Sequence, residues 1–141
     1  MEPLIRTIML WLSLTFALPA ADEVPYVRHV PPERLATLHF GAAVGQGREQ
    51  GILGAYDARS RTIFLREDWN SRNVTDVSVL VHELVHYLQD RASGAYECAA
   101  AREGLAYEAQ QRWLQMFGRT LEEAFGLDKL TLKLRTSCLP Y

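Results

Sequence analysis

An eleven-residue segment constrains this chain more than any other feature. The segment VLVHELVHYLQ contains the pattern H-E-x-x-H at His82, Glu83 and His86. Apolar residues surround the pattern on most sides, which predicts a largely buried helix from about Asp76 to Arg91. Buried histidine and glutamate side chains need polar partners, so this helix must carry either a polar site or a hydrogen-bonded network in the core.

Helix geometry makes this segment a candidate metal site. Four residues of a helix turn about 400° and rise about 6 Å, so His82 and His86 project from the same face. Two imidazole nitrogens placed in this way fit two corners of a tetrahedral Zn²⁺ site. Glu83 is rotated about 100° from His82, where it can hold and deprotonate a metal-bound water. The alternative interpretation is a pair of core histidines that are satisfied by hydrogen bonds alone.

A catalytic zinc ion needs a third protein ligand and an open position for water. No histidine follows His86, and the chain has only two cysteines, so the third ligand is a carboxylate or one of the upstream histidines, His29 and His39. We expect the two upstream histidines to have surface or local hydrogen-bonding roles.

A second helix is expected from about Tyr96 to Phe117, and it offers three glutamates. Helical phase places Glu103 at the border of the apolar face, which includes Ala99 and Phe117, and directs Glu97 and Glu108 toward solvent. We therefore predict that Glu103 completes the site, with Gly104 beside it allowing a close approach of the two helices.

Tyr107 follows Glu103 by one helical turn. Its hydroxyl can donate a hydrogen bond to the oxyanion of a tetrahedral intermediate, and the alternative is that its ring only packs in the core. Trp69 and Tyr56 are expected to pack around the cleft or the core. Asn73-Val-Thr75 spells a glycosylation acceptor, and Asn73 or Thr75 can equally cap the helix that follows.

HELVHYLQ followed by REGLAYEAQ resembles the gluzincin metallopeptidases, and small exported bacterial gluzincin-like proteins in particular. The resemblance covers roughly residues 51–115. It implies that His82, His86 and Glu103 bind zinc, and that Glu83 is the general base. The stretch GAYDARSRTIFLRE is similar to the hairpin at the sheet edge of such proteins, where an edge strand lines the cleft.

The remaining segments predict an α+β, zincin-like domain. ILGAY and RTIFLRE form a β-hairpin, and a helix begins at Pro31-Pro32. The glycine-rich stretch 41–54 is expected to form loops and a strand, and a short helix is expected over 120–125. The tail LTLKLRT alternates in polarity and predicts a final strand.

The first twenty residues predict a signal peptide. An apolar run from Ile8 to Leu18 follows Arg6 and precedes small residues, with cleavage expected after Ala20. The run is too short to span a bilayer. The alternative interpretations are a buried N-terminal helix or an uncleaved membrane anchor. Residues 21–141 would then form one exported domain, periplasmic or extracellular, with no stable membrane span.

Export changes the interpretation of the two cysteines. In an oxidising compartment a disulfide between Cys98 and Cys138 is the expected state, and it would stabilise the fold by roughly 4 kcal/mol through loop closure. Two buried thiols are the alternative.

The function that follows is zinc-assisted hydrolysis of a peptide bond in a peptide or protein substrate. A formal net charge of −2 leaves no basic surface for nucleic acid, and we expect a monomer. A zinc-bearing binding or inhibitory module that has lost turnover is the second hypothesis. The small size of the chain favours that module, whereas Glu83 favours the enzyme, because zinc binding alone does not need it.

Overall fold

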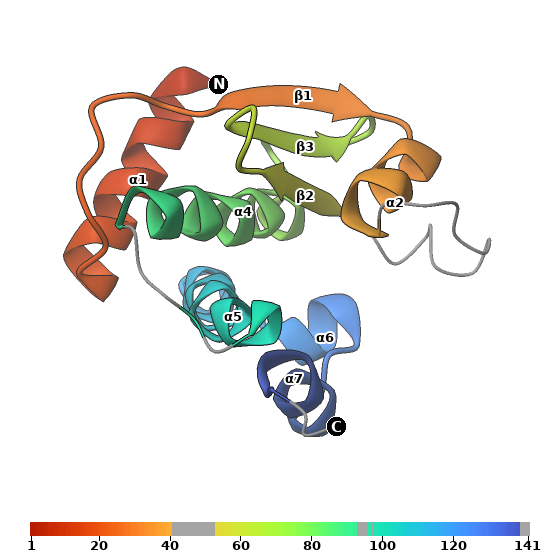
Figure 1. Cartoon of the computed structure of the whole chain (residues 1–141). Helices are drawn as coiled ribbons and strands as arrows, with labels where there is room; N and C mark the ends of the chain where they lie inside the picture. Colours follow the sequence, from red (N-terminus) through yellow and green to blue (C-terminus); the bar gives the residue numbers. More distant parts are fainter. Residues whose placement is uncertain (41–52, 93–95, 97, 139–141) are drawn as a thin grey trace.

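A small mixed β-sheet lies over a long central helix, three other helices pack against these two elements, and the two C-terminal helices pack on one of those three (Figure 1). The computed structural model describes residues 1–40, 53–92, 96 and 98–138, so most of the expected glycine-rich loop lies outside the described residues. In chain order the elements are α1 (Glu2–Phe16), β1 (Tyr26–Val30), α2 (Pro32–Phe40), β2 (Gly54–Asp57), β3 (Thr62–Arg66), α4 (Val74–Ala92), α5 (Ala99–Gln115), α6 (Leu121–Phe125) and α7 (Lys129–Thr136). The α+β class is confirmed.

The expected hairpin is present as β2 and β3. These strands pair antiparallel, with Tyr56 opposite Ile63, and β1 pairs parallel to β3 on the other side. Asp57 stabilises the turn, since its carboxylate accepts hydrogen bonds from the Ser60 hydroxyl at 2.6 Å and from the Arg59 backbone N–H at 3.3 Å. The order β1-β3-β2 leaves β2 at one edge of the described sheet.

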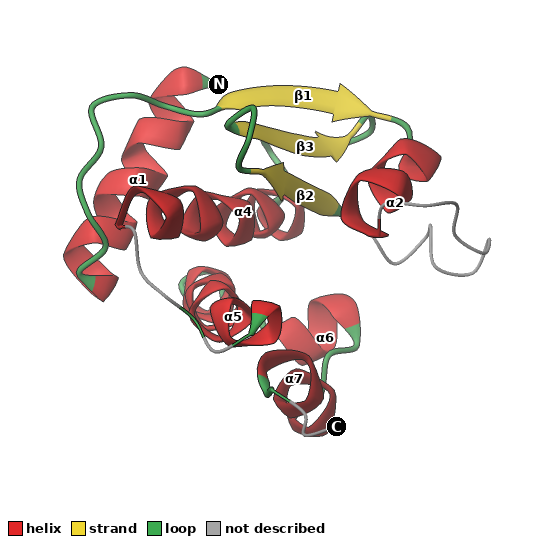
Figure 2. Ribbon diagram, viewed as in Figure 1, coloured by secondary structure: helices red, strands yellow, loops and turns green. Residues whose placement is uncertain are grey.

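The two faces of the sheet are covered by different helices, as the alternation of side chains along a strand requires. Ile63 and Leu65 belong to the main core with α4, whereas Phe64 packs with Ala55 and with Leu35 of α2. Figure 2 shows α4 beneath the sheet and α5 beyond α4.

The central helix α4 begins where the sequence predicts. The Asn73 side chain accepts a hydrogen bond from the Asp76 backbone N–H at 3.1 Å, which makes Asn73 the cap. Every residue from Val77 to Gln89 is buried. The helix is buried all round because it packs against the sheet, α1 and α5.

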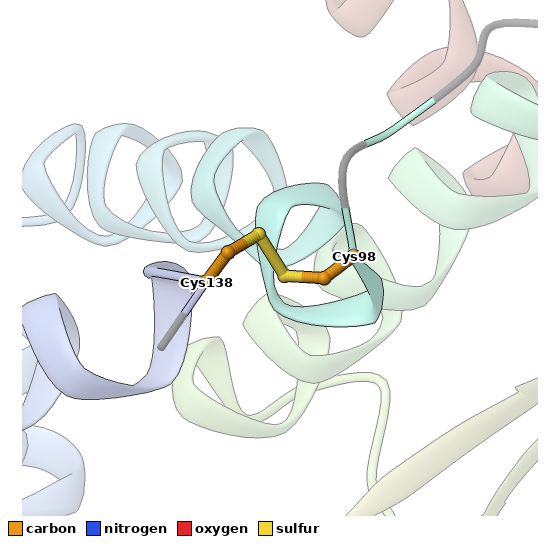
Figure 3. Close-up of a disulfide and its surroundings, with 2 residues drawn as sticks. All are labelled: Cys98 and Cys138. Carbon is orange, nitrogen blue, oxygen red and sulfur yellow. A yellow bond between two sulfur atoms is a disulfide. The ribbon is translucent and has the colours of Figure 1, made fainter. Parts of the chain in front are cut away.

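The disulfide between Cys98 and Cys138 is present, with the two Cα atoms 5.9 Å apart (Figure 3). It joins the residue that precedes α5 to a residue that follows α7. Helix α5 is shorter than expected at both ends, and the short helix α6 lies where the sequence predicts.

The prediction of a C-terminal strand is wrong, because LTLKLRT lies in helix α7. The Asp128 carboxylate caps this helix by accepting a hydrogen bond from the Thr131 backbone N–H at 2.8 Å. Leu130 and Leu134 are exposed, so the alternation does not correspond to one buried face. Local capping and good helix-forming residues decide the conformation here.

In the full chain the apolar N-terminal run forms helix α1. This helix buries Ile5, Ile8, Met9 and Leu12 in the main core. The buried N-terminal helix was the alternative to a signal peptide. The chain then returns along the molecule, and the Tyr87 hydroxyl donates a hydrogen bond to the Glu23 carbonyl at 2.8 Å. Signal cleavage after residue 20 stays a prediction. No helix in the described ranges is long and apolar enough to cross a membrane.

Candidate metal centre

Three side chains from two helices converge at the contact between α4 and α5. The Nε2 atoms of His82 and His86 lie 2.8 and 3.0 Å from the two carboxylate oxygens of Glu103. One ligand atom from each residue lies within 4.8 Å of the other two. Both histidines are buried, and the Glu103 side chain is 28% exposed, so the group is open on one side.

The local sequence explains why these groups meet. His82 and His86 stand one turn apart on α4, with ring centroids 5.2 Å apart. The face of α5 that meets them contains Ala106 and Ala109, both fully buried, and these small side chains allow close helix packing. The expectation for Gly104 is wrong, since a Cβ atom there would meet nothing within 4 Å.

The phase that we predicted for α5 is correct for Glu103 and Glu108 but too wide for its apolar face. As expected, Glu108 is exposed, and it also pairs with Arg112 at 3.7 Å. Glu97 lies outside the described residues. Ala99 and Phe117 are exposed, because one starts the helix and the other follows its end.

Charge is distributed unequally within the group. Burial raises the pKa of Glu103, but hydrogen bonds from His82 and His86 outweigh burial and hold this pKa well below its usual range. Burial also lowers the pKa of His86, but the hydrogen bond and negative charge of Glu103, together with the charge of Glu83, give a net increase. Glu103 is therefore the anionic member of the group at neutral pH.

Two buried glutamines contact the other ring nitrogens, and the sequence analysis did not identify them. Nδ1 of His82 lies 2.9 Å from Oε1 of Gln110, and Nδ1 of His86 lies 2.8 Å from Oε1 of Gln89. Spacing contained a signal: Gln89 follows His86 by three residues and Gln110 follows Glu103 by seven, so each shares a helix face with a site residue.

Arg102 also has a structural role that the sequence did not suggest. Its guanidinium donates a hydrogen bond to Asp90 at 2.7 Å and another to the His86 carbonyl at 3.4 Å. This ion pair joins α4 to α5 beside the histidines. These contacts account for an arginine on the side of α5 that meets α4.

Glu83 lies beside the three-residue group and faces strand β2. It is buried, and a Cβ atom added at Gly54 would lie 3.3 Å from its Oε2 atom and 2.8 Å from Cγ1 of Val79. A glycine at this edge of the sheet avoids overlap with Val79 and a tight contact with the Glu83 carboxylate. Gly54 carries no local sequence signal of this role, because the contact is with another element.

Tyr107 packs against the site on the α5 side. Its ring meets the His82 ring edge to face, with centroids 4.6 Å apart, and its hydroxyl oxygen accepts a hydrogen bond from Arg135 of α7 at 3.1 Å. Burial raises the pKa of Tyr107 more than Arg135 lowers it, so the phenol stays protonated at neutral pH.

The other candidate residues lie elsewhere. His29 is exposed on β1, and its ring lies 5.9 Å from the ring of Trp69. Trp69 donates a hydrogen bond to the Asp76 carbonyl at 2.6 Å, and Tyr56 packs on Tyr87. The side chain of His39 lies outside the described residues.

Among the described residues, His82, His86 and Glu103 form the one group whose geometry can hold a metal ion.

The chemistry of this donor set fits a divalent transition metal. Two imidazoles and one carboxylate are a common protein ligand set for catalytic zinc. The Nε2 atoms lie 2.8 and 3.0 Å from the carboxylate oxygens. Two lone pairs repel at this distance, so the arrangement is stable only with a proton or a cation between them. The residues thus fit the ion that the sequence implies.

Fold and site together define an α+β protein with a candidate His-His-Glu metal centre. The chain belongs to the family described as "Domain of unknown function (DUF6647)", whose model matches residues 1–140. Neither the curated proteins nor the solved structures contain a match to this chain.

Proposed function

We propose that this protein is an exported, zinc-dependent peptide hydrolase of the gluzincin type, with a minimal zincin-like domain. The observation that carries the proposal is the convergence of His82, His86 and Glu103, with Glu83 held beside them. An anionic third ligand and a neighbouring second carboxylate are what hydrolysis by a metal-activated water requires.

Each residue has a separate role in this proposal. Nε2 of His82, Nε2 of His86 and the Glu103 carboxylate would hold Zn²⁺. When bound, zinc would polarise the scissile carbonyl and lower the pKa of a water molecule, so that the water can be deprotonated and attack the carbonyl carbon. Glu83 takes the proton from that water and later passes it to the leaving amine.

Tyr107 supplies a hydrogen-bond donor in the same region. Because Arg135 donates to its oxygen, the phenolic proton of Tyr107 is free to point toward a substrate oxygen. A protonated phenol beside the His82 ring can stabilise the negative charge that develops on the carbonyl oxygen.

Strand β2 supports a peptide as the substrate. Within the described part of the chain it pairs only with β3, so its other edge has no strand partner. An extended peptide can add to such an edge by main-chain hydrogen bonds. Gly54 of β2 adjoins Glu83, so a peptide bound along this edge would pass the general base.

The variant Glu83→Gln tests this proposal. It should keep about one zinc per chain, because Glu83 is not a ligand, and lose on the order of 10²–10⁴ in peptide hydrolysis rate. An unbiased peptide library supplies the substrate, and Glu108→Gln, a change at an exposed site, is the matched control. Equal rates for Glu83→Gln and the natural chain would refute the role of Glu83. Zinc binding by both forms with cleavage by neither would support a zinc-bearing binding module instead.

A further inference from the structure

We propose that Gln89 and Gln110 are positioning residues of the metal centre, each fixing the proton of one histidine ring on Nδ1 so that Nε2 is free for the metal. This inference rests on the proposed metal centre and concerns two residues that do not touch the metal. Both side chains are buried, with exposed fractions of 2% and 5%.

The orientation of the Gln89 amide follows from its backbone partner. Its Nε2 atom donates a hydrogen bond to the Arg102 carbonyl at 3.1 Å. A carbonyl oxygen can only accept, so the amide cannot be reversed without bringing two oxygens together. The Oε1 atom must therefore face Nδ1 of His86, at 2.8 Å, and this oxygen also only accepts. His86 consequently carries a proton on Nδ1, and the proton through which Nε2 binds Glu103 is the one that a metal ion would replace.

A longer chain of hydrogen bonds gives the same result for His82. The Ser78 hydroxyl donates its proton to the Thr75 carbonyl at 2.6 Å, so its oxygen is left to accept. Gln110 donates to that oxygen through Nε2 at 3.2 Å. Its Oε1 atom then faces Nδ1 of His82 at 2.9 Å, which places a proton on this nitrogen as well.

The consequence is a convergent pair of Nε2 atoms that point at Glu103. A partner on the second ring nitrogen fixes both the rotation and the tautomer of a metal-binding histidine. A carboxamide provides this partner without adding charge. Hydrogen bonds link both glutamines, both histidines and Glu103, and Glu103 is the single negative member of this group.

Zinc affinity measured by competition with a chromophoric chelator tests the proposal. Gln89→Met and Gln110→Met keep the size of the side chain and remove the acceptor, and each should weaken Zn²⁺ binding by roughly 10- to 100-fold. Gln111→Met is the matched control on the same helix. Gln111 accepts a hydrogen bond from the Leu121 backbone N–H at 2.7 Å, away from the histidines, so its loss should leave zinc affinity within about twofold.

The conservative variant Gln110→Glu separates positioning from a purely structural role. Glutamate keeps an acceptor facing Nδ1, and the Ser78 hydroxyl can turn from Thr75 to donate to the other oxygen. Zinc affinity should return to at least that of the natural chain, whereas a structural explanation predicts the loss seen for Gln110→Met.

Nitrogen-15 NMR of the zinc-loaded natural chain reads the protons directly and needs no variant. Two slowly exchanging Nδ1–H signals are expected, with both Nε2 atoms bound to metal. Metal-bound Nδ1 atoms, or unchanged zinc affinity in folded Gln89→Met and Gln110→Met chains, would overturn the proposal. A natural chain that binds no zinc would instead refute the proposed function on which it rests.

Discussion

Helix α4 meets α1 and α5 through two contacts of opposite character. Toward α1 the contact is apolar, with Ile5, Ile8 and Leu12 of α1 buried against the core. Toward α5 it holds the histidines, both glutamines, Glu103 and the pair of Arg102 with Asp90. The first contact requires only apolar side chains of suitable size, whereas the second requires particular polar atoms at particular distances.

The contact with α5 contains the candidate metal centre, whereas the contact with α1 contributes apolar burial. A buried polar group is costly unless its atoms have partners, and the α5 side supplies partners for the histidine rings and for both glutamine amides. It is also the side that the disulfide reinforces, because Cys98 and Cys138 hold α7 near α5. Changes on the α5 side should therefore alter the site, and changes on the α1 side should not.

The largest expected effect is on stability, from loss of the disulfide. Replacing both Cys98 and Cys138 by serine should lower the free energy of unfolding by about 4 kcal/mol, since 40 residues separate them. Denaturant unfolding, monitored by circular dichroism, measures the change. A loss below about 1 kcal/mol would mean that α7 is held by packing alone.

Removing the Tyr107 hydroxyl should reduce turnover and leave zinc in place. Tyr107→Phe keeps the ring that packs on His82 and loses the donor, so kcat should fall on the order of 10²-fold. Steady-state peptide hydrolysis with a parallel zinc determination provides the measurement. If kcat is unchanged, packing is the whole role of Tyr107.

A smaller effect is expected at the edge of the sheet. Gly54→Ala would place a Cβ atom 2.8 Å from Cγ1 of Val79 and 3.3 Å from the Glu83 carboxylate. The shift of Glu83 should cost on the order of tenfold in kcat, with zinc affinity unchanged. Gly104→Ala is the control, because open space surrounds that position. Equal losses at the two glycines would contradict the contact between β2 and Glu83.

Removal of residues 1–20, the predicted signal peptide, should have no effect on zinc affinity. Helix α1 contributes no residue to the metal centre, although its loss uncovers apolar surface of the core. Zinc titration of the chain 21–141 beside the full chain measures this. Weaker zinc binding by the shorter chain would show that the two sides of α4 are coupled.

The sequence predicts the elements whose signals are local. Periodicity and capping predict α4, the hairpin of β2 and β3, and the solvent exposure of Glu108, because these features depend on residues close together in the chain. The i, i+4 spacing of His82 and His86 fixes their common face in the same way.

What the sequence misses depends on contacts between elements. Gln89 and Gln110 acquire partners only when α4 and α5 pack, and the space beside Gly54 is set by Glu83 of another element. The alternation of LTLKLRT predicts a strand, but alternation indicates a strand only where one face is buried, and α7 buries no residue. Contacts between elements cannot be predicted from the local sequence of one helix.

Metal content after dialysis against a mild chelator tests the central claim most directly, in purified Glu103→Ala and Glu108→Ala chains. Both variants remove one glutamate from α5, but only Glu103 contacts the two histidines. Glu103→Ala should lose its zinc, since two histidines are too few ligands for tight binding, and Glu108→Ala should retain about one equivalent. Retention of zinc by a folded Glu103→Ala chain would contradict the three-residue metal centre.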